Sequence, residues 1–103
     1  MPPPYLVTPT AANDIDVIWK YIASDNLEAA NRVDEAIYAA FVLLGANSML
    51  GSVRKDATSA PVRFWPVTQF PNFIVVYVPE PKPIQVVAVV HGKRDLRSFM
   101  RLR

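Results

Sequence analysis

The chain has 103 residues, of which 51% are hydrophobic and 19% are charged, and its formal net charge is +2. This length and composition predict one globular domain over residues 1–103 and argue against a disordered chain. The absence of cysteine excludes a disulfide framework and a thiolate zinc site, and with a single histidine in the sequence we expect neither a metal nor a cofactor.

The first predicted elements are a short strand and a helix. Tyr5–Val7 is a strand candidate, and Thr8 followed by Pro9 is typical of a helix start, with Thr8 as the N-cap. The helix is expected to run to about Ser24. Its inner face is indicated by apolar residues at the spacing i, i+3, i+4 and i+7, namely Ile15, Ile18, Trp19 and Ile22.

A second helix is predicted directly after the first. Asp25 is the expected N-cap, with Glu28 three residues later approximating a capping box. The helix should end near Leu44, with Gly45 as its C-cap. Because about two residues separate the helices, they should form an antiparallel hairpin. The inner face of the second helix is expected to be Ala30, Val33, Ile37, Ala40, Phe41 and Leu44.

Each helix also carries apolar residues away from its inner face. They are Val17 and Tyr21 in the first helix and Tyr38 and Val42 in the second. Isolated exposed apolar residues are normal in soluble proteins. A hairpin that is apolar on two sides could instead accept a segment of a partner, and the sequence leaves both interpretations open.

The second half of the chain predicts three strands after a loop over residues 45–60. The predicted strands are residues 61–67, 73–78 and 84–90. The turns between them are residues 69–72 and 79–83. Pro66 cannot donate to a strand ladder, so the first of these strands should lie at a sheet edge. The other two are almost entirely apolar, which is typical of central strands.

These elements give the order β-α-α-β-β-β. The predicted fold is α+β, with the helix hairpin packed on one face of a mainly antiparallel sheet. The last ten residues place apolar side chains among four arginines, so residues 94–103 are expected to form a short helix or a tail packed on the domain.

Charge is unevenly distributed along the chain. Residues 1–52 contain two Lys or Arg against six Asp or Glu, whereas residues 53–103 contain nine against three. This separation suggests an anionic partner for the second half. The alternative is that solvated lysines and arginines happen to fall there.

The sequence lacks the motifs of phosphate-binding loops, zinc proteases and serine hydrolases. RNA cleavage by attack of the 2′-hydroxyl is still conceivable, because it needs only a base, an acid and cations. Histidine is the residue type used most often as a general acid or base, and His91 is followed by Lys93 and Arg94. The alternative is structural: His91 hydrogen-bonds a nearby backbone group, and Arg94 pairs with Asp95.

Several motifs, in this order, resemble the ParE/RelE superfamily of bacterial toxins from type II toxin–antitoxin systems, and ParE most closely. Residues 63–67 (RFWPV) match a family strand, Tyr77 matches the tyrosine of the next strand, and residues 87–95 match the closing motif. Residues 47–52 depart from the usual Pro-x-x-Gly-Arg element. The first helix matches the family pattern in Ala12, Asp14, Ile15, Ile18, Trp19, Tyr21 and Ile22.

The resemblance implies a cytoplasmic toxin that forms a hetero-oligomer with a cognate ParD-like antitoxin, whose flexible tail folds onto it. ParE-like members are associated with inhibition of DNA gyrase, whereas RelE-like members are ribosome-dependent mRNA endonucleases. No tyrosine follows Tyr77, so the C-terminal catalytic tyrosine of RelE-like enzymes is not evident. We therefore expect a non-enzymatic gyrase inhibitor, with an mRNA endonuclease and a non-toxic interaction module as alternatives.

The sequence also excludes some partners and nominates contact residues. No apolar run is long enough to span a membrane, and we expect neither a secretory signal at residues 1–4 nor direct DNA binding without the antitoxin. Candidate antitoxin contacts are Val17, Tyr21, Tyr38 and Val42. Candidate target contacts are Arg63, Trp65, His91, Lys93, Arg94 and Arg97. No residue is assigned to catalysis, but for an endonuclease the candidates would be His91, Arg63, Arg94 and Tyr77.

Overall fold

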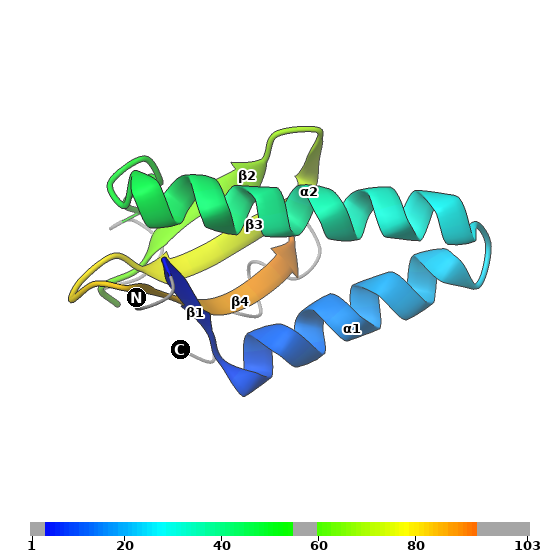
Figure 1. Ribbon diagram of the computed structural model, residues 1–103, viewed down its shortest axis with the longest axis horizontal. Helices are drawn as coiled ribbons and strands as arrows, with labels where there is room; N and C mark the ends of the chain where they lie inside the picture. The colour runs from blue at the N-terminus through cyan, green and yellow to red at the C-terminus, as the bar shows by residue number, and fades with distance from the viewer. Residues whose placement is uncertain (1–3, 55–59, 93–103) are drawn as a thin grey trace.

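The computed structural model describes residues 4–54 and 60–92 as a helix hairpin on a four-stranded mixed sheet. The expected α+β fold and its element order are confirmed (Figure 1). The elements are β1 (Tyr5–Val7), α1 (Pro9–Ala23), α2 (Leu27–Ala46), β2 (Arg63–Val67), β3 (Phe70–Val78) and β4 (Ile84–His91).

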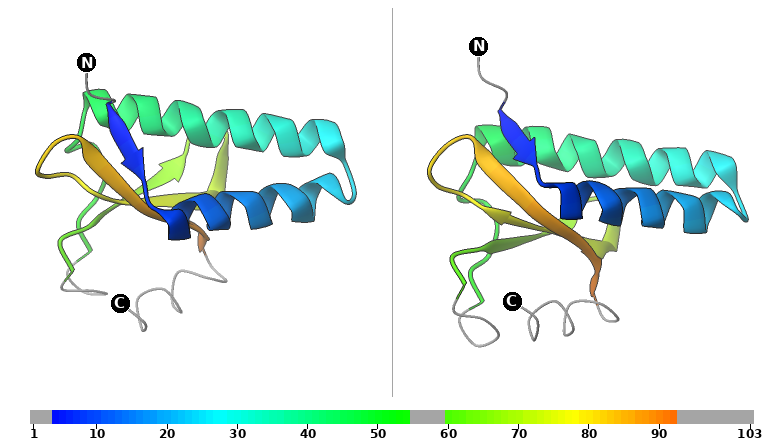
Figure 2. Two further views of the ribbon diagram at one scale, coloured as in Figure 1. Left: turned by 60° about the horizontal axis from the view of Figure 1, so that its bottom comes forward. Right: turned by 90° about the horizontal axis from the view of Figure 1, so that it is seen from below.

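The sheet is built around β4, which lies between β1 and β3 in the order β1-β4-β3-β2. β1 pairs with β4 in parallel, whereas β3 is antiparallel to both β4 and β2. Both helices cover the same face of the sheet (Figure 2). The nearly continuous apolar run of β4 is explained by this position, because its side chains are buried on both faces of the sheet.

The apolar side chains of the strands divide between two clusters. Val75, Val86 and Val89 belong to the cluster on the helix side, where they meet the inner faces of α1 and α2. Val76 and Ala88 belong to a second cluster on the other face of the sheet. Successive residues of a strand point to opposite faces, so each central strand contributes to both clusters.

The start of α1 follows the sequence prediction. Thr8 is its N-cap: the hydroxyl accepts a hydrogen bond from the Ala11 N–H at 3.2 Å, and Pro9 occupies the first turn. Ile15 is buried on the inner face, while Trp19 is half-buried and donates from Nε1 to Asn31 on α2 at 2.9 Å. This bond joins the two arms of the hairpin.

The observed ends of α2 differ from the sequence prediction. Its N-cap is Asn26 rather than Asp25, since Asn26 Oδ1 accepts from the Ala29 N–H at 3.0 Å. The helix continues through Gly45 to Ala46 and is capped by Asn47. Gly45 serves close packing instead: a Cβ there would lie 2.7 Å from the carbonyl oxygen of Pro4. The predicted inner face of α2 is confirmed, because all six of its residues are buried.

The position of the turn between β2 and β3 also differs from the prediction. β3 begins at Phe70, so the turn is formed by Thr68 and Gln69 rather than by residues 69–72. The edge position of β2 is confirmed. Phe64 exchanges two backbone hydrogen bonds with Ser52 on the outer side of β2. Pro66 shares that outward orientation, so its missing N–H costs no bond to β3.

Beyond the end of β1, an acidic side chain accepts a backbone hydrogen bond from β4. The β1–β4 register stops at Val7 opposite Val86, and the next backbone bond runs from the Thr8 N–H to Val86. Beyond it, the Val89 N–H donates to Oδ2 of Asp14 on α1 at 3.1 Å. The carboxylate thus acts as the acceptor that another strand would supply, and it ties α1 to the edge of β4.

We therefore expect Asp14→Ala to lower the free energy of unfolding by about 1–3 kcal/mol, because the partly buried Val89 N–H loses its charged acceptor. The matched control is Asp16→Ala, which removes only an exposed ion pair with Lys20 and should cost no more than about 0.5 kcal/mol. Urea unfolding of the two variants tests this, and equal midpoints would contradict it.

Candidate functional site

Tyr77, a candidate catalytic residue, anchors the loop that follows α2. Its side chain has 0% exposure, and its hydroxyl lies between two backbone groups of the loop. The hydroxyl accepts a hydrogen bond from the Gly51 N–H and donates one to the Ser48 carbonyl oxygen, both at 2.8 Å. Because both hydrogen bonds are made to backbone groups of the loop, the Tyr77 hydroxyl has a structural role: it fixes this loop against β3.

Arg63, opposite Tyr77 in the β2–β3 register, holds the same loop. Its Nη1 donates to the carbonyl oxygens of Gly51 at 2.6 Å and Met49 at 3.2 Å. Gly51 is enclosed by this pair, because a Cβ there would lie 2.6 Å from the Tyr77 hydroxyl and 3.0 Å from Arg63 Cβ. The absence of a side chain at Gly51 is what permits this approach.

The buried environment changes the chemistry of the Tyr77 phenol. Burial raises the pKa of Tyr77 above its ordinary value of 10.0, while the Gly51 N–H and the Arg63 guanidinium oppose that rise. The phenol is thus held in its protonated form, the form that donates to Ser48. A raised pKa makes this group less suited to accept a proton at neutral pH.

His91 lies far from this pair. It is the last residue of β4 and is opposite Phe73, with the two ring centroids 5.7 Å apart in a T-shaped contact. Phe73 and Tyr77 are four residues apart on β3, which corresponds to about 13 Å along a strand. The described candidates for catalysis therefore occupy two ends of the sheet instead of one site.

The remaining target-contact candidates are only partly placed. Trp65 is half-buried and packs against the helix-side cluster, and no acceptor for its buried Nε1 is found within the described residues. Lys93, Arg94 and Arg97 lie outside the described residues. Their proposed contact with a target therefore stays a prediction, as do the predicted fold of residues 94–103 and the Arg94–Asp95 pair.

The candidate antitoxin contacts are exposed on the hairpin. Val17 and Tyr21, one turn apart on α1, are 56% and 72% exposed. Tyr38 and Val42 are likewise exposed one turn apart on α2, and Tyr38 packs edge-on against Phe41 with ring centroids 5.2 Å apart. The structure thus presents two separate apolar pairs, one on each helix.

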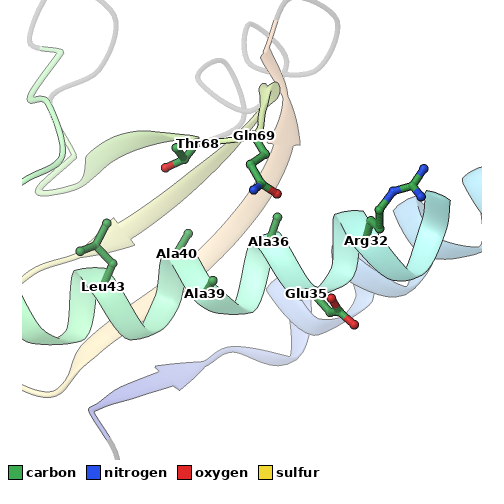
Figure 3. Close-up of a pocket in the computed structure, with 8 residues that line it drawn as sticks. All are labelled: Arg32, Glu35, Ala36, Ala39, Ala40, Leu43, Thr68 and Gln69. Carbon is green, nitrogen blue, oxygen red and sulfur yellow. The ribbon is translucent and has the colours of Figure 1, made fainter. Parts of the chain in front are cut away.

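A groove beside α2 was not anticipated from the sequence. It has a volume of about 450 Å³ and lies between α2 and the β2–β3 turn (Figure 3). Small side chains of α2 leave the space, with a polar rim at both sides. The lining residues are Arg32, Glu35, Ala36, Ala39, Ala40, Leu43, Thr68 and Gln69. The alanines of α2 are the only sequence signal that could have indicated this groove. The sequence does not show that the turn between β2 and β3 lies opposite them.

Two acidic residues, Asp34 and Glu35, are adjacent on α2. Burial, and then the neighbouring charge of Glu35, raise the pKa of Asp34 above its ordinary value of 3.8. Burial also raises the pKa of Tyr38, with further contributions from Asp34 and Tyr5. A carboxylate whose charge is disfavoured in this way would gain from a cation placed beside it.

Two further features bear on the kind of site. Within the described residues, no three His, Asp or Glu side chains gather closely enough to hold a metal ion. Over the same residues, no helix has the length and apolar content needed to span a bilayer.

Comparison with known proteins identifies relatives of this fold. The family model of the ParE toxin of the type II toxin–antitoxin system parDE matches residues 5–96. A solved structure of the chromosomal ParDE system from P. aeruginosa is similar, with a TM-score of 0.70 and 22% sequence identity. The similarity covers 86% of this chain and 95% of that chain. No curated protein sequence gives a significant match.

The Tyr77 anchor predicts a specific pH dependence. Tyr77→Phe should lower the free energy of unfolding at pH 7 by about 1–3 kcal/mol, because the Gly51 N–H and the Ser48 carbonyl lose their partner. The pKa of Tyr77 is raised on folding, so its contribution is complete below pH 10 and is lost as the pH rises through the folded-state value.

The stability difference between the wild type and Tyr77→Phe should therefore shrink above pH 10. Urea unfolding of both proteins between pH 7 and pH 11 measures it. Tyr21→Phe is the matched control, because the Tyr21 side chain is 72% exposed on α1 and lies away from the loop after α2. A difference for Tyr77→Phe that does not change with pH would contradict this account.

Proposed function

The chain belongs to the ParE toxin family of type II toxin–antitoxin systems, and we propose that it inhibits DNA gyrase by binding and is neutralised by a cognate ParD-like antitoxin. Family membership supports the toxin class and implies an antitoxin. Gyrase as the target and binding as the mode of action are the proposal.

The separation of the candidate catalytic residues is the observation that favours binding over catalysis. Proton transfer requires a catalytic group within hydrogen-bond distance of its reaction partner. Tyr77 and Arg63 hold the loop after α2, whereas His91 lies about 13 Å away along the sheet. Tyr77 and Arg63 are thus engaged at one end of the sheet, and His91 lies at the other end. The RNase alternative would therefore depend on His91 and residues outside the described part of the chain.

The helix hairpin is the surface we propose for the antitoxin. Its exposed apolar pairs, Val17 with Tyr21 and Tyr38 with Val42, suit the apolar face of a segment that folds on binding. Ala39 and Leu43 of the groove lie on the part of α2 adjoining Val42, so the groove and the α2 pair can be covered by one segment. The acidic surroundings of Asp34 favour a basic residue in that segment.

The target surface is proposed on the opposite half of the chain, where the basic residues are concentrated. His91 ends β4 shortly before Lys93 and Arg94 in the sequence, so it is the described contact candidate nearest in sequence to that cationic segment. An acidic surface of a protein target would be complementary to such a segment.

The mode of action is tested with the purified chain and purified bacterial gyrase. We expect supercoiling of plasmid DNA to be inhibited while transcripts in a translation extract remain intact, because the proposed mechanism involves no bond cleavage. His91→Ala should weaken the inhibition, and Tyr77→Phe, if folded, should leave it largely unchanged. Cleaved transcripts that disappear in His91→Ala, with supercoiling unaffected, would establish the endonuclease alternative instead.

The antitoxin surface is tested separately. We expect Tyr38→Ser/Val42→Ser and Val17→Ser/Tyr21→Ser each to raise the Kd for the cognate ParD-like antitoxin by about tenfold or more, as truncation of central apolar contacts does. The matched control is Met49→Ser/Leu50→Ser, which removes an equally exposed apolar pair from the loop after α2. Isothermal titration of all three variants decides, and unchanged affinity for both hairpin variants would refute this assignment.

A further inference from the structure

The loop that follows α2 exposes three large apolar side chains within five residues. Met49, Leu50 and Val53 are 52%, 45% and 49% exposed. A single exposed apolar side chain is normal, whereas several that are close in the chain and bordered by polar residues are typical of a surface that contacts another protein. We call these three residues the loop patch.

The backbone of the loop patch is held against β2. Ser52 exchanges two backbone hydrogen bonds with Phe64, one at 2.8 Å and one at 2.9 Å. Arg63 donates from Nη1 to the carbonyl oxygen of Met49 at 3.2 Å. These bonds hold the loop independently of the Tyr77 phenol. A loop that is already fixed loses little conformational entropy when a partner covers it, so the loop patch is preorganised for binding.

A positive charge beside the loop patch has no carboxylate to neutralise it. Arg63 is half-buried, and its reported hydrogen bonds go to neutral carbonyl oxygens. Among the described residues, ion pairs join Lys20 to Asp16 and Arg32 to Glu28, and none involves Arg63. A partner that covered the loop patch would remove water from this guanidinium. A carboxylate on the partner would compensate for that loss with a charge-assisted hydrogen bond.

We propose that the loop patch and Arg63 bind the cellular target of the toxin, through a target surface on which apolar side chains surround a carboxylate. Charge distinguishes this surface from the one proposed for the antitoxin. The apolar pair on α2 begins four residues after Asp34, which favours a basic residue in the antitoxin, whereas the loop patch adjoins an unneutralised arginine. The inference rests on the proposed toxin function, but it does not require that the target be gyrase.

Growth inhibition by the full-length chain, expressed without antitoxin, tests the loop patch because it responds to whichever target the cell contains. We expect Met49→Ser/Leu50→Ser/Val53→Ser to raise the expression level needed to stop growth by about tenfold or more, as loss of central apolar contacts does. The matched control is Leu6→Ser/Leu27→Ser, which removes side chains that are 42% and 58% exposed outside the loop. It should be as toxic as the wild type at equal protein level.

A pair of substitutions at Ser52 tests the charge complementarity. Ser52 is exposed and lies within the same loop, and its backbone pairs with the residue next to Arg63. Ser52→Glu would neutralise Arg63 and repel a carboxylate on the target, so it should reduce toxicity severalfold. Ser52→Lys, of similar length and opposite charge, should retain full toxicity. Equal toxicity of the two variants would contradict the proposal.

Two measurements on the purified proteins identify the occupant. The loop-patch variant should bind the cognate antitoxin with unchanged Kd in isothermal titration, and the wild type should sediment as a monomer. A raised Kd would assign the loop patch to the antitoxin, and a wild-type dimer that the variant loses would assign it to a second copy of the chain. Either result would overturn the proposal. If the loop-patch variant fails to fold, the Ser52 pair decides.

Failure of the inference and failure of the proposed function give different results. A toxic wild type and an equally toxic loop-patch variant would overturn the inference and leave gyrase inhibition intact. A toxic wild type that leaves gyrase supercoiling unaffected would refute gyrase as the target, while reduced toxicity of the loop-patch variant would still support the inference. A wild type that does not stop growth would overturn both.

Discussion

Burial of β4 on both faces is the constraint from which the other features follow. A strand with apolar residues on both sides needs a cover above and below it, and a hydrogen-bonding neighbour on each edge. The hairpin covers one face, β3 pairs along one edge, and β1 pairs along the first part of the other edge. Where β1 stops, the carboxylate of Asp14 accepts the next outward N–H. Each surrounding element thus satisfies a requirement that β4 imposes.

Features with local causes could be predicted from the sequence. The inner face of α2 follows from apolar spacing, and the edge position of β2 follows from a proline that cannot donate. The errors arose where two local solutions are equally good. Asp25 and Asn26 are adjacent and both suit an N-cap, and residues 71–72 (PN) have turn chemistry although pairing with neighbouring strands extends β3 across them.

Features that depend on contacts distant in sequence could not be predicted. Tyr77 and Ser48 are 29 residues apart, and no periodicity indicates that the phenol is bonded to the loop after α2. The same holds for Gly45, which is typical of a helix end in isolation but whose missing side chain accommodates Pro4. From the sequence, Arg63, Tyr77 and His91 were candidates for the same catalytic site. The strand register instead places Arg63 and Tyr77 at one end of the sheet and His91 at the other.

The two edge strands of the sheet, β1 and β2, differ in the backbone groups that they leave for pairing with another strand. On β2, Ser52 already occupies the outward groups of Phe64, and Pro66 offers no donor. On β1, the register and the bond from Thr8 to Val86 turn the backbone groups of Tyr5 and Val7 outward. An endless ribbon of molecules needs an open strand at both edges of the sheet, and along the described residues Phe64 and Pro66 offer no free donor at the β2 edge. Growth of a fibril by strand addition is therefore disfavoured at the β2 edge.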